Sequence, residues 1–291
     1  MRAWKSKPYG GSAIVWIKKQ EIEALSANIR KIIDGQDVDL RVSREGVWNI
    51  LKNDIHTLAG LKNEQVTVLK QDRDTLKDTL ADISHQLKTP LTSMMIMADL
   101  LETAPADRQA EFLQNIKLSL ARTEWLVSAL LKMAKLEAGA VAFVPESVHT
   151  AELIELALEP LRIQLELKNQ RVTASGETVL HCDKRWTAEA LTNILKNASE
   201  HSPDGADIRV ESGRNPICAW VAVTDRGAGL ETAQIAKLFR RFEGSDSGAG
   251  FGIGLPLARA ILRGQEGDIE VAGGGKGEGA TFTLKFYQNP L

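Results

Sequence analysis

The first half of the chain carries apolar side chains at the spacing of one packed helical face. From Glu21 to about Leu101 the pattern predicts helix, with a break near Gly35 to Ser43. Counting Pro90 as one position, the apolar residues then follow alternating steps of four and three: Leu76, Leu80, Ile83, Leu87, Met94, Met97 and Leu101. This spacing predicts a coiled-coil-like seam that packs against other helices.

A second helix is predicted from Asp107 to Glu137, after a turn at Ala104 to Ala106, and Gly139 closes it. Its apolar positions are Phe112, Ile116, Leu120, Val127, Leu130 and Ala134. The two helices form a hairpin, and a single hairpin cannot cover its own apolar stripe. Two hairpins paired about a two-fold axis bury both stripes in a four-helix bundle, so the pattern predicts a homodimer.

After Gly139 the pattern changes to short apolar strands alternating with helices. The predicted strands are Val141 to Val148, Arg171 to Ala174, Thr178 to Cys182, Ile208 to Glu211, Trp220 to Thr224, Ile269 to Ala272 and Thr281 to Phe286. The main predicted helices are Thr150 to Lys168, Arg185 to His201 and Ile253 to Arg263. This order is typical of an α+β domain. We therefore expect a helical input or linker region over 1–75, a dimerisation hairpin over 76–140 and an α+β domain over 141–291.

Composition excludes several classes of function. A net charge of −2 and a pI near 6.3, without a basic run, argue against nucleic-acid binding. Cys182 and Cys218 lack metal-site spacing and are predicted to be core residues. The apolar run Ala13 to Ile17 is far shorter than the ~20 residues of a membrane helix, so we expect a cytoplasmic protein, tethered to a membrane only by a segment absent from this chain. Three aromatic residues among lysines mark either the edge of such an anchor or an amphipathic start: Trp4, Tyr9 and Trp16.

His85 is the candidate nucleophile of the first helix. At roughly 100° per residue it points about 200° away from both Ile83 and Leu87, so its imidazole should face solvent while they pack in the bundle. An exposed imidazole of fixed orientation is a suitable nucleophile. Pro90 removes one backbone donor just after it, which predicts a kink or loosening within the helix; the other interpretation is that one helix ends there and another begins.

Asn193 and Asn197 lie four residues apart on one predicted helix and therefore share a face. The opposite face carries the apolar residues Leu191, Ile194, Leu195 and Ala198. Amide oxygens are hard ligands that can hold a magnesium ion and its waters against phosphates, whereas a solvated polar face is the alternative for this helix alone.

Two glycine-rich turns follow the asparagine helix. Asp225, Gly227 and Gly229 come directly after a strand, where a carboxylate can accept from an exocyclic amine and glycines let the backbone approach a ring. A glycine series, Gly248, Gly250, Gly252 and Gly254, then opens the helix Ile253 to Arg263, so that backbone N–H groups can meet phosphate oxygens. No Lys-Ser or Lys-Thr follows, which excludes a P-loop. A third pair, Gly277 and Gly279, tightens the turn before the last strand.

Taken in order, these segments resemble the sensor histidine kinases of bacterial two-component systems, whose catalytic domain is an α/β sandwich of the GHKL (Bergerat) type. Asp82 to Pro90 is similar to the family's phosphoacceptor box, and Asn193 to Ala198 to its magnesium-binding box. Asp225 to Gly229 resembles the adenine-reading box, Phe239 to Phe242 the phenylalanine box, and Gly250 to Leu255 the second glycine box. The resemblance covers about residues 76 to 287.

The resemblance implies that His85 takes the γ-phosphoryl group of ATP and passes it to an aspartate of a response regulator. It implies that Asn197 binds magnesium and that Arg240 or Arg241 contacts a phosphate. It also implies that Thr281 is among the residues that bind the nucleotide. Two positions depart from the family, since Gln86 cannot take the imidazole proton and Glu200 stands where relatives often carry lysine. Asp82 or water is then left to handle that proton, and the hydroxyl of Thr89, one turn after His85, can orient a water for regulator dephosphorylation.

Two other functions use the same ATPase fold. A chaperone-like or mismatch-repair-like ATPase drives dimer closure, but such proteins place further domains after the nucleotide site. A non-catalytic member would bind ATP and dock a partner, and Gln86 and Glu200 are the arguments for it.

Overall fold

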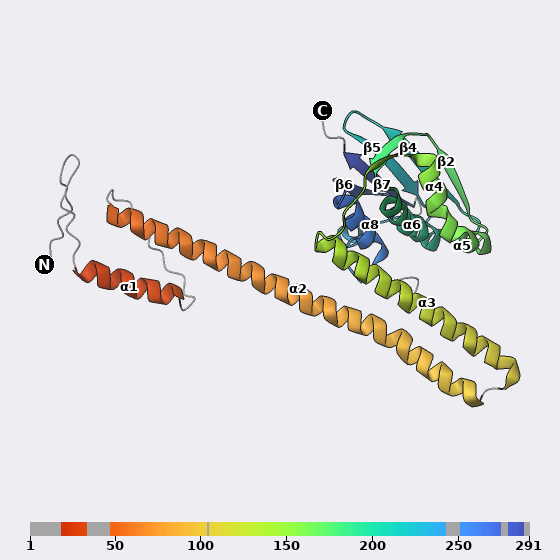
Figure 1. The fold of residues 1–291 in the computed structure, drawn as a ribbon, viewed down its shortest axis with the longest axis horizontal. Helices are drawn as coiled ribbons and strands as arrows, with labels where there is room; N and C mark the ends of the chain where they lie inside the picture. Colours follow the sequence, from red (N-terminus) through yellow and green to blue (C-terminus); the bar gives the residue numbers. More distant parts are fainter. Residues whose placement is uncertain (1–18, 34–46, 104, 243–250, 275–278, 288–291) are drawn as a thin grey trace. The chain divides into compact units, whose positions relative to one another are not determined.

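The computed structural model describes residues 19–33, 47–103, 105–242, 251–274 and 279–287, and its packing divides the chain into two units, Met1–Ala81 and Asp82–Leu291 (Figure 1). Within these ranges no helix is both long enough and apolar enough to cross a membrane. Several predicted features lie outside the described residues: the aromatic N-terminus, the break at 35–43, and Gly248, Gly250 and Gly277. The three domain boundaries stay predictions.

Three helices come first: α1 (Lys19–Ile33), α2 (Val47–Thr103) and α3 (Ala106–Glu137). Helix α2 continues through Pro90, so the interpretation that one helix ends there and another begins is wrong. Helix α3 ends where predicted, and Gly139 follows it with a φ of 62°, a conformation that glycine adopts without strain.

Helix α3 shows a buried face that the apolar pattern did not predict. Leu126, Ala129 and Met133 are almost fully buried and pack into the core of the following domain, beside α8 (Gly254–Arg263) (Figure 1). Of the predicted positions, Leu120, Val127 and Ala134 stay exposed within the single chain. One helix therefore presents one apolar face to the domain and a second one to solvent.

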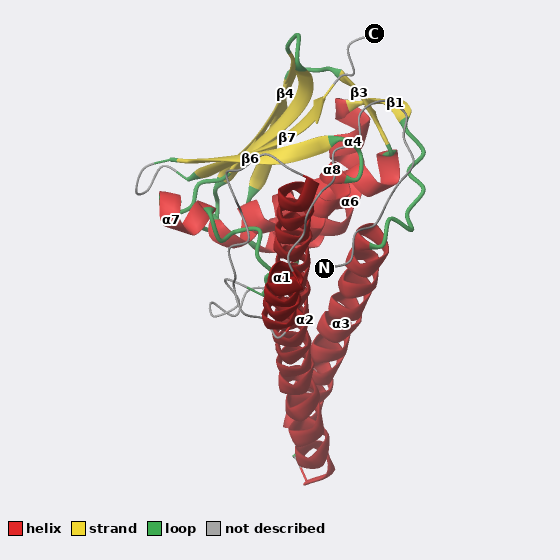
Figure 2. Cartoon of the chain, turned by 90° about the vertical axis from the view of Figure 1, so that its left-hand side faces the viewer, coloured by secondary structure: helices red, strands yellow, loops and turns green. Residues whose placement is uncertain are grey.

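The domain after α3 is a sheet covered on one face by helices (Figure 2). Its strands are β1 (Glu146–His149), β2 (Arg171–Ser175), β3 (Val179–Cys182), β4 (Asp207–Arg214), β5 (Cys218–Thr224), β6 (Gly267–Gly273) and β7 (Ala280–Tyr287). Five strands form one sheet in the order β2-β4-β5-β7-β6, antiparallel except for the β2–β4 pair, while β1 and β3 form a separate antiparallel pair. The predicted helical hairpin followed by an α+β domain is confirmed.

The remaining helices are α4 (Thr150–Leu158), the 3₁₀ turn η1 (Glu159–Leu161), α5 (Arg162–Leu167), α6 (Lys184–His201) and the short α7 (Thr232–Ile235), together with α8. Helix α6 packs between α4 and α8 against the sheet. Alternate residues of β7 face this helical layer: Ala280, Phe282, Leu284 and Phe286. Cys182 and Cys218 are buried free thiols, which confirms their prediction as core residues, and burial raises the pKa of Cys182.

Two predicted elements differ from the structure. The strand predicted from Val141 begins only at Glu146, because the Val144 N–H donates to the Asp183 carboxylate and Pro145 has no N–H to pair. The helix predicted from Thr150 to Lys168 is interrupted by η1, which contains Pro160. Proline removes a backbone donor, and the chain tightens locally into a 3₁₀ turn.

Candidate functional site

A cavity of about 520 Å³ lies over α6, between the end of β5 and the start of α8. Most of the predicted nucleotide-binding residues that the structure describes line it: Asn193, Asn197, Asp225, Gly227, Gly229, Gly252 and Gly254. Segments separated by some 60 residues thus meet at one site, which is what a binding function for them requires.

Helix α6 holds the two asparagines in place. It begins at Asp183, whose Oδ1 accepts from the N–H groups of Arg185 and Trp186, both at 3.1 Å. Its far end is fixed by buried Gln170, whose side-chain amide donates to the carbonyl oxygens of Ser199, Ser202 and Pro203. With both ends fixed and one face in the core, the other face is held rigidly against the cavity.

The two asparagines differ in their partners. The Asn193 amide donates to the Glu189 carbonyl oxygen at 2.9 Å, and its Oδ1 faces Gly254, where an added Cβ would lie only 3.1 Å away. Asn197 is half-buried, and its side chain makes no hydrogen bond within the part of the chain that the structure describes. The half-exposed Asn197 amide oxygen is therefore available to a metal ion, as its chemistry allows.

Asp225 is buried at the other end of the site, with 3% of its surface exposed. Its Oδ1 accepts from the N–H groups of Gly227 at 2.8 Å and Ala280 at 3.0 Å. Among the described residues no protein group donates to its Oδ2. Since a buried carboxylate oxygen is costly without a donor, Oδ2 is suited to accept from a ligand amine.

Glycine is required around this aspartate. A Cβ on Gly279, which has a φ of 77°, would lie 2.1 Å from the Asp225 carbonyl oxygen, and one on Gly227 would lie 2.9 Å from the His201 carbonyl oxygen. Any other residue at these positions would push the chain away from the floor of the cavity.

The second glycine turn leads into the N-terminus of α8. Gly252 has a φ of 65°, and its carbonyl oxygen accepts from the Phe242 N–H at 3.1 Å. Gly254, Leu255 and Pro256 at the first turn of α8 line the cavity. Free backbone N–H groups at a helix start attract anions, so this end of the cavity suits phosphate.

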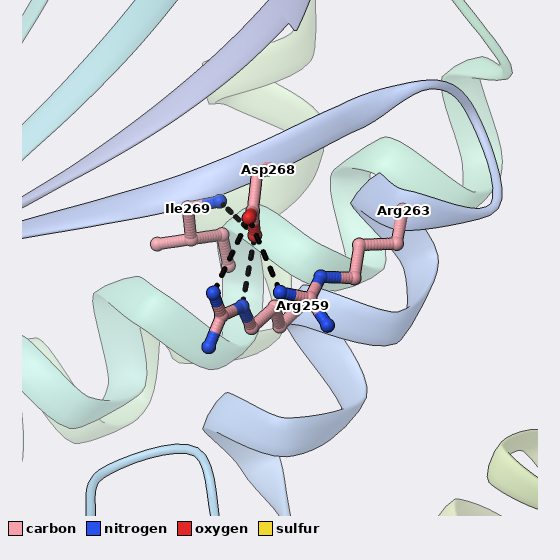
Figure 3. A network of polar contacts seen from close by, with 4 residues as sticks. All are labelled: Arg259, Arg263, Asp268 and Ile269. Atoms are coloured by element: carbon pink, nitrogen blue, oxygen red, sulfur yellow. Dashed lines mark hydrogen bonds and ion pairs between the residues drawn. The ribbon is translucent and has the colours of Figure 1, made fainter. Parts of the chain in front are cut away.

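The other side of α8 is tied to β6 by Asp268 (Figure 3). Arg259 donates two hydrogen bonds to this carboxylate, at 2.8 and 3.2 Å, and Arg263 adds one at 3.3 Å. Burial opposes ionisation of Asp268, but these bonds and the Ile269 N–H outweigh it and lower its pKa to about 2. The guanidinium of Arg259 also lies 4.4 Å from the ring centre of Phe239, so one arginine links α8, β6 and the phenylalanine segment.

The lining residues that sequence reasoning missed include an aromatic residue and two lysines: Trp125, Lys196 and Lys237. Trp125 reaches the cavity from α3, where it stacks on Phe251 with ring centres 6.1 Å apart. The Lys196 ammonium lies 4.7 Å from the Trp125 ring centre. No local motif marks a tryptophan on a distant helix, whereas Lys196 shares the helical face of Asn193 and Asn197 and was detectable from spacing.

Glu200 also lines the cavity, and Lys196 lies 3.8 Å from its carboxylate. Burial raises the Glu200 pKa, and the positive charge of Lys196 partly offsets this rise.

Three other predicted site residues lie outside the cavity lining. Arg241 forms an ion pair with Glu137 at the end of α3, and burial lowers the pKa of its guanidinium. Arg240 follows Lys237, to whose carbonyl oxygen its N–H donates. The side chain of Thr281 points to the opposite face of the sheet from Ala280 and Phe282, and its hydroxyl pairs with that of Thr224 at 2.9 Å.

The residues predicted on α2 lie away from the cavity lining as well. The His85 side chain is exposed, as its position off the seam predicted, and Asp82 is exposed too. Gln86 is half-buried, and the Thr89 hydroxyl donates to the His85 carbonyl oxygen at 3.2 Å.

Two family models match the chain, and together they cover more than half of it. Residues 75–139 match the His Kinase A (phospho-acceptor) domain, and residues 182–290 match the histidine kinase-, DNA gyrase B- and HSP90-like ATPase. The chain belongs to the sensor histidine kinases.

Known sensor histidine kinases align with most of this chain. The heme sensor protein HssS of Staphylococcus saprophyticus is 27% identical over 242 residues, which are 82% of this chain and 52% of that protein. The signal transduction histidine-protein kinase/phosphatase MprB of a Mycobacterium species is 27% identical over 244 residues, covering 79% of this chain and 47% of that protein. The chain therefore spans about half the length of these relatives.

The fold of this sensor histidine kinase also matches solved structures. The histidine kinase ThkA, in complex with the response regulator protein TrrA, has a TM-score of 0.62 at 18% identity and covers 78% of this chain and 66% of that one. At this identity the likeness concerns the fold, in which a helical hairpin precedes an α/β domain.

Proposed function

We propose that this protein binds ATP with magnesium in the cavity over α6, phosphorylates His85 and passes the phosphoryl group to an aspartate of a response regulator. The observation that carries the proposal is the polarity of the cavity. A buried carboxylate with one free oxygen lies beside the last residues of α6, and the glycine turn that starts α8 lies beside Asn193, two turns earlier on the same helix. An adenine amine and a triphosphate are complementary to these two ends.

Magnesium held through Asn197 would neutralise phosphate charge when bound. The amides at the start of α8 then orient the γ-phosphate for in-line attack. A nitrogen of the His85 imidazole forms the new bond to phosphorus as the bond to the β–γ bridging oxygen breaks and ADP leaves. The imidazole proton passes to Asp82 or to water, because the Gln86 amide orients the ring but does not accept the proton.

His85 and the cavity must meet for this reaction. His85 is exposed on α2 and does not line the cavity, while Trp125, Leu126 and Met133 attach the domain to α3. Either the domain leaves α3 or a second protomer presents its histidine. Exposed apolar residues on the hairpin, such as Leu91 and Leu120, support a homodimer.

A response regulator partner is supported by the fold shared with ThkA, which was solved with the response regulator TrrA. In the second step the regulator's aspartate attacks phosphorus, the phosphorus–nitrogen bond breaks and the imidazole regains a proton. Phosphatase activity toward the same regulator is part of the proposal, supported by the Thr89 hydroxyl one turn from His85 and by the likeness to the kinase/phosphatase MprB.

The test is incubation with magnesium and γ-labelled ATP, comparing wild type with His85→Gln. We expect label on wild type and none on the variant, and the label should be acid-labile and alkali-stable, as a phosphoramidate is. His56→Gln is the matched control, because His56 lies on the same helix. Measurable ATP binding without label would contradict the kinase and favour a non-catalytic ATP-binding protein, with Gln86→Glu the first variant to examine.

A further inference from the structure

Lys196 lines the cavity but has no role in the reaction proposed above. Asn193, Lys196, Asn197 and Glu200 are spaced three and four residues apart on α6, so they share one helical face, and all four line the cavity. Lys196 directly precedes Asn197, the residue suited to magnesium. Its ammonium contacts Trp125, which stacks on Phe251 directly before the Gly252 turn, so it lies on the side of the cavity where phosphate is expected.

The partners of the Lys196 ammonium are ones that a phosphate can replace. It lies 4.7 Å from the ring centre of Trp125 and 3.8 Å from the Glu200 carboxylate. Trp125 in turn stacks on Phe251, directly before the Gly252 turn. A partly exposed cation–π contact and an ion pair near the limit of contact are both weak, whereas several phosphate oxygens attract an ammonium strongly.

The charges around the cavity favour the same residue. A triphosphate brings several negative charges, yet Glu200 places a carboxylate on the same helical face as Asn197. Lys196 is the cation paired with that carboxylate. The other lining lysine, Lys237, follows α7, which packs on β6 (Figure 2). An unneutralised Glu200 would repel the ligand, so a cation is needed beside it.

We infer that Lys196 binds the phosphate end of the nucleotide, and that Trp125 of α3 and Glu200 position its ammonium for this contact. The inference rests on the proposed binding of ATP. The phosphate-binding lysine of this protein is then Lys196, one residue before Asn197. Because Trp125 belongs to α3, nucleotide binding is also coupled to the contact between α3 and the domain.

The experiment compares the affinities of the full chain for ATP with magnesium and for adenosine, by calorimetry and competition. Lys196→Met should raise the Kd for ATP at least about tenfold, as the loss of one charge-assisted contact does, and leave the Kd for adenosine unchanged. Lys196→Arg should keep most of the ATP affinity. Lys184→Met is the matched control, because Lys184 also pairs with a glutamate, at the start of α6 and outside the cavity.

A double variant that moves the positive charge from position 196 to position 200 distinguishes a role of Lys196 in binding phosphate from a role in folding. Glu200→Lys, added to Lys196→Met, should restore ATP affinity if position 196 acts through its charge. Equal losses of ATP and adenosine affinity, or an ATP-specific loss in Lys237→Met with none in Lys196→Met, would overturn the inference while ATP binding by wild type stands. Failure of wild type to bind ATP at all would overturn the proposed function as well.

Discussion

The hydroxyl of Thr89 is one turn beyond His85 and is fixed by a bond to the backbone. Its Oγ1 donates to the His85 carbonyl oxygen at 3.2 Å, and the side chain is exposed. Because the hydroxyl proton is engaged there, the oxygen lone pairs remain free to accept from a water molecule. A water held there would lie on the same side of the helix as His85, which suits the proposed phosphatase activity.

Thr89→Ala should lower the rate of regulator dephosphorylation by about 100-fold, the scale of one positioned catalytic group, and leave His85 phosphorylation intact. Both rates are measured with a purified cognate regulator and labelled phosphate. Thr79→Ala is the matched control, because the Thr79 hydroxyl makes the same kind of bond to the Thr75 carbonyl oxygen on the same helix. Equal loss of both activities would assign Thr89 to structure instead.

Site residues were predictable from the sequence where their signals are local. Asn193 and Asn197 follow from helical spacing, and Asp225 with Gly227 from a strand that runs into a glycine turn. Trp125 was not predictable, because it reaches the cavity from a helix some 70 residues earlier than the segments around it. The same holds for Arg241, whose ion pair with Glu137 depends on how α3 packs against the domain.

At the scale of elements, a single carboxylate fixes the arginine side of α8 to β6. Asp268 ties both arginines of α8 to β6 (Figure 3). Arg259 also lies against Phe239. The start of the same helix forms the expected phosphate end of the cavity. Loss of this carboxylate therefore affects the position of α8 as well as local stability.

Asp268→Asn should reduce the free energy of unfolding by about 1 kcal/mol at neutral pH, a value discounted for the partial exposure of the pair. The folded pKa of about 2 is below the ordinary value of 3.8, so the unfolded chain takes up the proton first as pH falls. The difference between wild type and variant should thus be constant above pH 5 and shrink between about pH 4 and 2. Urea unfolding across this range measures it.

Glu211→Gln provides the control, since it removes a charge from an exposed position on β4. If both variants showed the same stability at neutral pH, the ties from Arg259 and Arg263 would contribute nothing measurable. A difference that persisted unchanged to pH 2 would assign the effect to packing and not to charge.

Element types followed from the apolar pattern more reliably than element ends. The asparagine helix, the closing strand and the hairpin helices occur where the periodicity placed them. Errors arose where a single side chain altered the backbone, as at Pro160 within η1 and at Asp183, which takes the N–H of Val144 away from strand pairing. Such competition is decided by tertiary contacts that periodicity does not contain.

At the scale of the whole molecule, the hairpin leaves apolar positions uncovered. Leu120 belongs to the predicted seam of α3 and is 59% exposed in the single chain. Packing against a second hairpin is the simplest way to remove this surface from water.

Leu120→Glu should convert the dimer to a monomer, because a buried charge without a partner is costly in a bundle core. Light scattering or sedimentation would show the mass fall by half, and circular dichroism would show whether the helices persist. Leu118→Glu is the control, since Leu118 is similarly exposed on α3 but lies about 200° from Leu120 around the helix. An unchanged mass for Leu120→Glu would mean that the dimer uses another face.

Three successive residues of α3 face three different surroundings. Trp125 lines the nucleotide cavity, Leu126 is buried in the domain core, and Val127 belongs to the exposed stripe. When sensors and kinases are recombined, α3 therefore counts as part of the catalytic domain as well as of the hairpin. A fragment that begins after Gly139 would lack Trp125 in its cavity and would expose the side of α8 that α3 covers. A junction placed before the hairpin keeps the cavity residue, the buried face and the exposed stripe of α3 in one fragment.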